Sequence, residues 1–345
     1  MITHRFPMNG RDRIRAIING IPADRCGFWL GNPHPDTLPI YHAYFGTSTL
    51  EELHLKLGSD LRWLSPQMTP TVYRHPEGKG FFDIGQHKKS HAEPGPLARC
   101  TTVTQVDGFD WPKLEYLDFT ECLGSLAAAT SYYRASGFWA PFFHDVIDLF
   151  GFEPFMLNLH DQPDVVHAAF ANVCGLYHEA NERFFAAGGT LVDALFFGND
   201  FGTQRDLLIS THHFDVFVLP WIRRFTEQAR RHGLQVMMHS CGSVHRLIGR
   251  LIDAGVQCLH PLQAKATGMD AVTLVRDFGG KVAFIGGIDT QELLVKATPE
   301  QIREEIRRLK DVFGPAWIAS PSHEALLPDI PPCNVAAMAE EALRL

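Results

Sequence analysis

The C-terminal half of the chain alternates short apolar runs with segments of helical periodicity. The run Leu191–Phe197 predicts a buried strand, and the segment from Phe214 to Gly233 predicts a helix. The same pattern predicts four more strands, over Gln235–Met238, Val256–Leu259, Val282–Ile285 and Trp317–Ala319. Further helices are predicted over Val244–Ala254, Asp270–Asp277, 298–313 and Asn334–Leu343. Because the links are short, this alternation predicts a parallel sheet.

One helix boundary carries a specific signal. The sequence Thr298-Pro299-Glu300-Gln301 combines an N-cap threonine, a proline at the first helical position and a capping-box glutamine. We expect this helix to end at Phe313, before Gly314.

The N-terminal half is less regular. Strands are predicted over Cys26–Leu30 and Asp60–Leu64, and helices over Arg11–Asn19, Ser48–Leu57 and Pro163–Ala187. Residues 69–110 are rich in glycine and proline and predict an antiparallel excursion or a long loop. No low-complexity linker interrupts the chain, so we expect a single domain over residues 1–345.

Regular strand–helix alternation over this length predicts an α/β fold of the (β/α)8 TIM-barrel class. An open doubly wound sheet is the alternative. It is disfavoured because no Gly-x-Gly-x-x-Gly follows any predicted strand, and Gly286-Gly287 is too sparse to be a dinucleotide fingerprint.

Composition narrows the class of partner. The chain has 345 residues, 45% of them hydrophobic, and a formal net charge of −8 without a long basic run, which argues against nucleic acid or an anionic membrane. No stretch approaches the roughly 18 apolar residues of a membrane span. The seven cysteines are scattered without a CxxC, and the N-terminus lacks the apolar core of a secretory signal. We therefore expect a cytoplasmic protein without disulfides.

Unusual polar side chains directly follow the predicted strands. They are Asn32 and His34; Asn199, Asp200 and Gln204; His239 and Cys241; His260 and Gln263; Asp289; and Ser322, His323 and Glu324. The carboxyl ends of parallel barrel strands form one face, where catalytic side chains collect. We therefore expect a site there.

Each of these residues also has a structural explanation. Asp200 and Asp289 have the positions of N-caps or turn formers, and His260 that of a barrel-wall residue. For Gln204, Gln263 and His323, the structural explanation is a hydrogen bond from the side chain to the loop backbone. Five successive strands that end in titratable or amide groups nevertheless exceed what packing requires, so the set favours a site.

A histidine and a cysteine stand two positions apart in His239-Ser240-Cys241, where a strand ends and a helix begins. This arrangement can direct imidazole and thiolate at one point, which suits zinc. The N–H groups of the following helix would also stabilise a thiolate. The same turn can carry these residues for packing alone, so both roles remain open.

Longer segments carry a family resemblance. They are 9–13 (NGRDR), 23–25 (ADR), 151–153 (GFE), 198–204 (GNDFGTQ), 239–243 (HSCGS), 286–291 (GGIDTQ), 321–323 (PSH) and 328–335 (PDIPPCNV). With these segments the chain resembles the uroporphyrinogen decarboxylase superfamily, and specifically its corrinoid-dependent methyltransferase branch. The resemblance implies a (β/α)8 barrel that either decarboxylates uroporphyrinogen or moves methyl groups between corrinoid proteins and thiol or folate acceptors.

In the branch that uses coenzyme M, zinc is held by a His-x-Cys pair and a later cysteine. The resemblance implies that His239 and Cys241 are ligands and that His323 takes the place of the later cysteine. A His-Cys-His set can still bind zinc and keep a fourth position open, with less negative charge. Cys333 falls where the family usually has glutamate, and we do not expect it to be a ligand.

The resemblance also implies roles for the other polar residues. Asp200, Glu153 and Gln204 are expected to act in catalysis, by orienting the substrate or supporting the metal ligands. Substrate contacts are expected from Asn32, His34, Asn199, His260, Gln263 and Asp289. The implied methyl donor is methylcobalamin carried by a separate corrinoid protein, and the implied acceptor is a thiol or tetrahydrofolate.

Two other functions remain open. The true decarboxylases have an arginine-rich motif at the first strand, whereas residues 28–34 here contain no arginine. Asp60 is a loose match to their essential aspartate. A lyase for a tetrapyrrole or another carboxylate, and a corrinoid-binding barrel without catalysis, are therefore the alternatives to methyl transfer.

Overall fold

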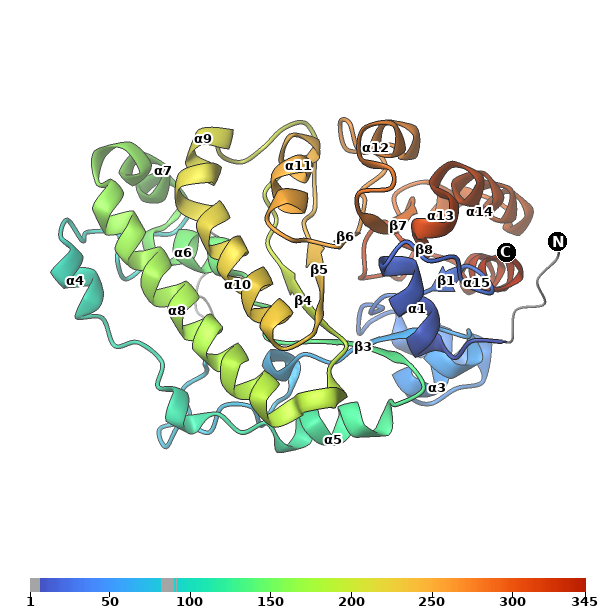
Figure 1. Ribbon diagram of the computed structural model, residues 1–345, viewed down its shortest axis with the longest axis horizontal. Coiled ribbons are helices and arrows are strands. Elements are labelled where there is room, and N and C mark those ends of the chain that lie inside the picture. Colours follow the sequence, from blue (N-terminus) through green and yellow to red (C-terminus); the bar gives the residue numbers. More distant parts are fainter. Residues whose placement is uncertain (1–6, 82–89, 91) are drawn as a thin grey trace.

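Parallel strands form the centre of the protein. The computed structural model describes residues 7–81, 90 and 92–345, and in this part of the chain eight parallel strands form a nearly closed barrel with helices around it (Figure 1). The strands are β1 (Gly27–Phe28), β2 (Leu61–Trp63), β3 (Tyr133–Ser136), β4 (Ala194–Gly198), β5 (Gln235–His239), β6 (Cys258–His260), β7 (Ala283–Ile288) and β8 (Trp317–Pro321). From β2 to β8 each strand pairs with the next, and β1 pairs with β8. The predicted (β/α)8 barrel is confirmed.

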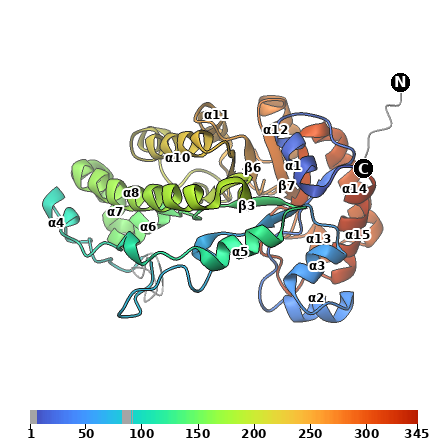
Figure 2. The same cartoon turned by 60° about the horizontal axis from the view of Figure 1, so that its bottom comes forward.

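The N-terminal helices are α1 (Gly10–Ile18), α2 (Leu38–Phe45), α3 (Leu50–Lys56), α4 (Val103–Asp107), α5 (Thr120–Ala128), α6 (Phe142–Phe150), α7 (Phe152–Asp161) and α8 (Pro163–Gly188). The C-terminal helices are α9 (Thr211–His213), α10 (Leu219–Arg231), α11 (His245–Asp253), α12 (Ala271–Phe278), α13 (Leu293–Lys296), α14 (Pro299–Phe313) and α15 (Pro332–Arg344). Helix α2 contacts both α3 and α15 (Figure 2). None of the helices in the described residues combines the length and apolarity needed to cross a membrane.

The predicted start of α14 is confirmed in detail. The Thr298 side chain accepts a hydrogen bond from the Gln301 N–H, and the Gln301 side chain accepts one from the Thr298 N–H. The helix ends at Phe313, and Gly314 follows with a positive φ of 68°.

Two local features differ from the prediction. Strand β3 was not expected, because its Arg134 reads as polar, yet this side chain is buried in a salt bridge from Nε to the Asp193 carboxylate at 3.0 Å. The helix predicted over 214–233 begins instead with a π-helical turn, Phe214–Val218, and continues as α10 to Arg231. Pro220 supplies no N–H for the regular ladder, which explains the wider turn before α10.

Part of the predicted excursion over 69–110 falls on residues 82–89 and 91, which lie outside the described residues. In the remainder, Tyr73 forms an isolated antiparallel bridge with Leu117, and α4 follows.

The barrel interior is a packed core. Alternate strand residues point inward and form one apolar cluster, which includes Trp29, Leu61, Tyr133, Phe196, Met237, Cys258, Ile285 and Ile318. Ile14 and Ile17 of α1 join the same cluster, and α1 contacts β1, β2, β3 and β8. Helix α1 therefore covers the amino end of the barrel, and the carboxyl end remains for a site.

Asp60 joins the two edge strands at the amino end of the barrel. Its Oδ2 accepts a hydrogen bond from the Phe28 N–H at 3.0 Å, and its own N–H donates to the Phe28 carbonyl at 2.8 Å. The guanidinium groups of Arg13 and Arg25 bind the carboxylate at 2.6 and 2.9 Å. Asp60 precedes β2, so it lies at the end of the barrel opposite to the predicted site. The match to a catalytic aspartate is therefore wrong, and the residue closes the barrel.

We predict that Asp60→Ala destabilises the protein by about 3–5 kcal/mol, because it leaves buried guanidinium groups without their carboxylate. Asp36→Ala is the control, since the Asp36 side chain is 78% exposed, and we expect a change within about 0.5 kcal/mol. Urea unfolding at pH 7 measures both. Equal stability of the two variants would contradict the role assigned to Asp60.

Candidate functional site

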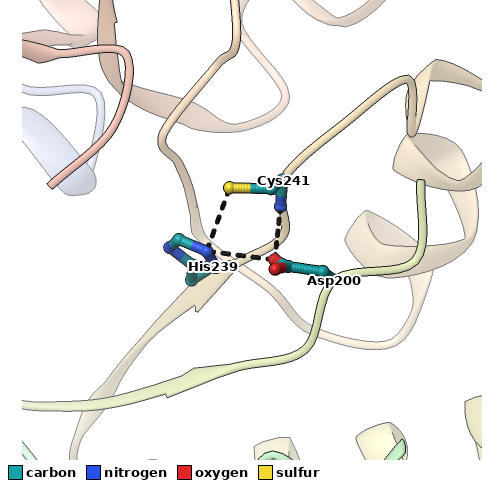
Figure 3. Close-up of side chains that lie close together, drawn as sticks. All are labelled: Asp200, His239 and Cys241. Carbon is teal, nitrogen blue, oxygen red and sulfur yellow. Dashed lines mark hydrogen bonds and ion pairs between the residues drawn. The ribbon is translucent and has the colours of Figure 1, made fainter. Parts of the chain in front are cut away.

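Asp200, His239 and Cys241 form a cluster at the carboxyl ends of β4 and β5, with their side chains directed toward one another (Figure 3). The Nε2 atom of His239 lies 3.1 Å from Oδ1 of Asp200 and 3.4 Å from Sγ of Cys241. The backbone N–H of Cys241 donates to the same Asp200 oxygen at 2.8 Å. An imidazole, a thiol and a carboxylate thus meet at one point.

The loops that carry this cluster are fixed by backbone contacts. The N–H of Asp200 donates to Nε2 of His144, at the start of α6, at 3.2 Å. Gly242, directly after Cys241, has a φ of 87° and packs so closely on Gly202 that an added Cβ would lie 2.2 Å from the Gly202 carbonyl oxygen. Only glycine satisfies both conditions there.

A second group of potential ligands lies on the other side of the same imidazole. The Nδ1 atom of His239 is 2.9 Å from Nδ1 of His260 and 3.6 Å from Oε2 of Glu324. Both His260 Nε2 and Glu324 Oε2 are buried and have no hydrogen-bond partner among the described residues. The rings of Trp29 and Phe196 pack against His260 at centroid distances of 5.2 and 5.5 Å. His239 is therefore shared by two donor groups, each with a carboxylate.

Burial and charge act in opposite directions on these groups. Burial alone lowers the pKa of His239, but the charge of Glu324 and the bond to Asp200 raise this pKa well above its usual value. Burial alone raises the pKa of Asp200, but the bond and charge of His239 hold it well below its usual range. Burial and the neighbouring His239 lower the pKa of His260. The protein therefore surrounds the imidazole with negative charge, as a cation site requires.

The donor geometry fits a zinc ion. Around tetrahedral zinc, with Zn–N near 2.0–2.1 Å and Zn–S near 2.3 Å, ligand atoms lie about 3.2–3.7 Å apart. The Nε2–Sγ and Nε2–Oδ1 distances of 3.4 and 3.1 Å are close to this range, and all three donor atoms lie within 4.8 Å of one another. Three protein ligands leave one coordination position open, as in catalytic zinc sites.

The structure does not bring two of the predicted residues into either donor group. His323 belongs to neither group, and its Nδ1 accepts a hydrogen bond from the Ala325 N–H at 3.1 Å. Glu153 is exposed in the first turn of α7, a position where a carboxylate stabilises the helix. The residue that faces His239 is Glu324, the next residue in the chain after His323. Sequence reasoning did not assign a role to Glu324 or to His144.

Several predicted substrate contacts have structural partners. Asn199 is buried and bonds the backbone of Phe143 and Ala140, and the Asp289 carboxylate accepts the N–H groups of residues 291–293 at the start of α13. The Asn32 N–H donates to the Glu324 carbonyl, and His34 Nδ1 accepts the Asp36 N–H. The contacts of Asp289 match the turn-forming role that was the structural alternative for this residue.

Gln204 and Gln263 connect the loops that surround the cluster. The Gln263 Oε1 accepts hydrogen bonds from the Gly242 N–H at 2.9 Å and from Gln204 Nε2 at 3.1 Å. Gln263 therefore supports the segment that carries Cys241, and Gln204 supports Gln263.

Comparison with known proteins identifies a protein family that this chain matches. The family model described as uroporphyrinogen decarboxylase (URO-D) matches residues 147–345, which is more than half of the chain. Among solved structures, the chain is similar to a methyltransferase from Methanosarcina mazei, with 16% sequence identity, a TM-score of 0.66, and coverage of 97% of this chain and 98% of that chain. This likeness shows a shared fold. The comparison with curated proteins gave no match.

We predict that Gly242→Ala destabilises the protein more than Gly20→Ala. Gly20 has a similar φ of 69° but nothing within 4 Å of an added Cβ, so Gly20→Ala should cost only the left-handed strain of about 1–2 kcal/mol. Gly242→Ala must also displace the backbone of residue 202. Free energies of unfolding in urea measure the difference, and equal costs would show that the Cys241 loop is not tightly held.

Proposed function

Because the chain belongs to the uroporphyrinogen decarboxylase family, we propose that it is a zinc-assisted methyltransferase. It would move a methyl group from a methylated corrinoid protein to a thiol acceptor. The observation that carries this proposal is the cluster of Asp200, His239 and Cys241 at the carboxyl end of the barrel.

The ligands would be Nε2 of His239, Sγ of Cys241 and Oδ1 of Asp200. A zinc ion bound there would supply Lewis acidity, which lowers the pKa of a thiol at the open position so that the anion exists near neutral pH. With Nε2 used as a ligand, the proton of His239 lies on Nδ1, where it donates to His260. Glu324 lies beside this bond and adds negative charge to the back of the ring. Such partners orient a ligand histidine and increase its basicity.

The acceptor thiol loses its proton to solvent at the barrel mouth, and its sulfur forms a bond to the methyl carbon of methylcobalamin. The cobalt–carbon bond breaks with both electrons on cobalt, so Co(III) becomes Co(I). The corrinoid protein would present its cofactor over the face formed by the carboxyl ends of the strands, where the cluster lies.

Two features argue against uroporphyrinogen as the substrate. A cavity at the carboxyl ends of β6, β7 and β8 has a volume of about 280 Å³, which is small for a tetrapyrrole. Among the described residues that line it there is no lysine or arginine, whereas uroporphyrinogen carries eight carboxylates. Burying carboxylates without cationic partners is unfavourable.

Metal content tests the ligand assignment. We predict that the purified wild-type protein carries about one zinc ion per chain and that Cys241→Ser loses it, because a hydroxyl is a much weaker ligand than a thiolate. Cys333→Ser is the matched control, since Cys333 is exposed and lies outside both donor groups. Elemental analysis measures zinc in all three proteins. Zinc retained in Cys241→Ser would remove this residue from the site.

Methyl transfer tests the function itself. Under anaerobic conditions the wild-type protein should convert methylcobalamin to cob(I)alamin when a thiol is added, with a methyl thioether as the second product. We expect Cys241→Ser to slow this reaction by about two orders of magnitude, because the Lewis acid is lost. Visible spectra follow the cobalt, and mass spectrometry identifies the thioether. Transfer to tetrahydrofolate alone would replace the thiol in the proposal, and release of CO₂ from a tetrapyrrole would favour the lyase.

A further inference from the structure

The cavity at the ends of β6, β7 and β8 is lined by residues that adjoin the two donor groups in the chain or by hydrogen bond. It is lined by Gln263, whose Oε1 accepts the N–H of Gly242 next to Cys241, and by His323, the residue before Glu324. Glu324 in turn faces His239. The cavity therefore borders two of the chain segments that carry the donor groups.

The groups that line this cavity are polar but not cationic. His323 accepts the Ala325 N–H at Nδ1, so its Nε2 is left to donate. The side-chain Oε1 of Gln263 already accepts two hydrogen bonds, whereas its side-chain Nε2 has no partner among the residues that the structure describes. Among the described residues that line the cavity, Asp329 is the only one with a carboxyl group, and Leu327 adds an apolar surface.

The charge around the cavity disfavours an anion. Lys265 follows Gln263 at a distance of two residues, but its Nζ is bound to the Glu292 carboxylate at 2.6 Å. Asp329 adds a negative charge on the lining itself. A sulfonate or carboxylate placed there would meet a like charge without a cation to offset it.

We propose that this cavity binds the methyl acceptor and that the acceptor is a small polar thiol without negative charge. This inference rests on the proposed methyl transfer and adds the chemical class of the acceptor. His323 then serves as a substrate-binding residue, through its Nε2–H, and not as a metal ligand. The methyl group moves from the corrinoid to the thiol sulfur, and the thiol proton is released to solvent.

Two thiols of matched length test the charge preference. In 2-mercaptoethanol a hydroxyl stands two carbons from the sulfur, and in 2-mercaptoethanesulfonate a sulfonate takes its place. With methylcobalamin at pH 8, above the ordinary titration range of histidine, we expect kcat/KM to be at least about tenfold higher for the neutral thiol. Ligand-observed NMR titration of both compounds runs in parallel and reads the preference without turnover.

A charge reversal tests the location. Asp329→Lys should reduce the preference for the neutral thiol by about tenfold, because it removes the carboxylate and adds a cation. Leu327→Lys places a cation at a second position on the cavity lining, at a residue that is 50% exposed, and should also reduce this preference. Asp311→Lys is the control, with the same charge change on the exposed surface of α14, and should keep the wild-type ratio.

The outcomes separate the two proposals. Equal or better use and binding of the sulfonate by the wild type would overturn the neutral acceptor and leave methyl transfer intact. The same ratio in Asp329→Lys, Leu327→Lys and Asp311→Lys would overturn the cavity as its site. If neither thiol is methylated although NMR shows binding of the neutral one, the proposed function fails and the cavity's preference stands.

Discussion

The imidazole of His239 is the group on which the candidate site depends, because both of its nitrogens are engaged. Nε2 faces the thiol of Cys241 and the carboxylate of Asp200, and Nδ1 faces His260 and Glu324. A single Asp200 oxygen contacts both the imidazole and the Cys241 N–H, so it fixes the relative position of two ligands. If either carboxylate were absent, the ring would lose one of the charges that hold it in place.

The two ends of the barrel divide structure and chemistry between them. At the amino end, arginines of α1 bind buried carboxylates: Arg13 binds Asp60, and Arg11 binds Asp193. The Arg13–Asp60 pair connects the cap to the edge strands β1 and β2, and the Arg11–Asp193 pair connects it to the start of β4. At the carboxyl end, comparable polar groups are left without full partners, as shown by His260 Nε2 and Glu324 Oε2. Incomplete satisfaction of buried polar atoms is costly for stability and is typical of functional sites.

Much of the fold was predictable because the C-terminal half repeats one pattern. Because the carboxyl ends of parallel strands form one face, the sequence also predicted Asp200, His239 and Cys241 on the same face, and the structure brings them together. The strand β3 escaped prediction, because the partner that makes Arg134 compatible with burial is Asp193, 59 residues away in sequence. His144 escaped for a similar reason, since it contacts Asp200 from the start of a helix.

The choice between His323 and Glu324 shows a different limit. Both follow β8, and outside a strand the alternation of side chains no longer decides which of two neighbours points inward. The assignment of His323 as a ligand came from the resemblance, and so did the role of Glu153. The structure instead places Glu324 against the imidazole and His323 on the adjacent cavity.

The most direct test is the location of the metal itself, by anomalous diffraction at the zinc edge from crystals of the zinc-loaded protein. The account predicts one peak bonded to Nε2 of His239, Sγ of Cys241 and Oδ1 of Asp200, with His323 outside the coordination sphere. A peak on the Nδ1 side, between His260 and Glu324, or no peak near His239, would contradict it.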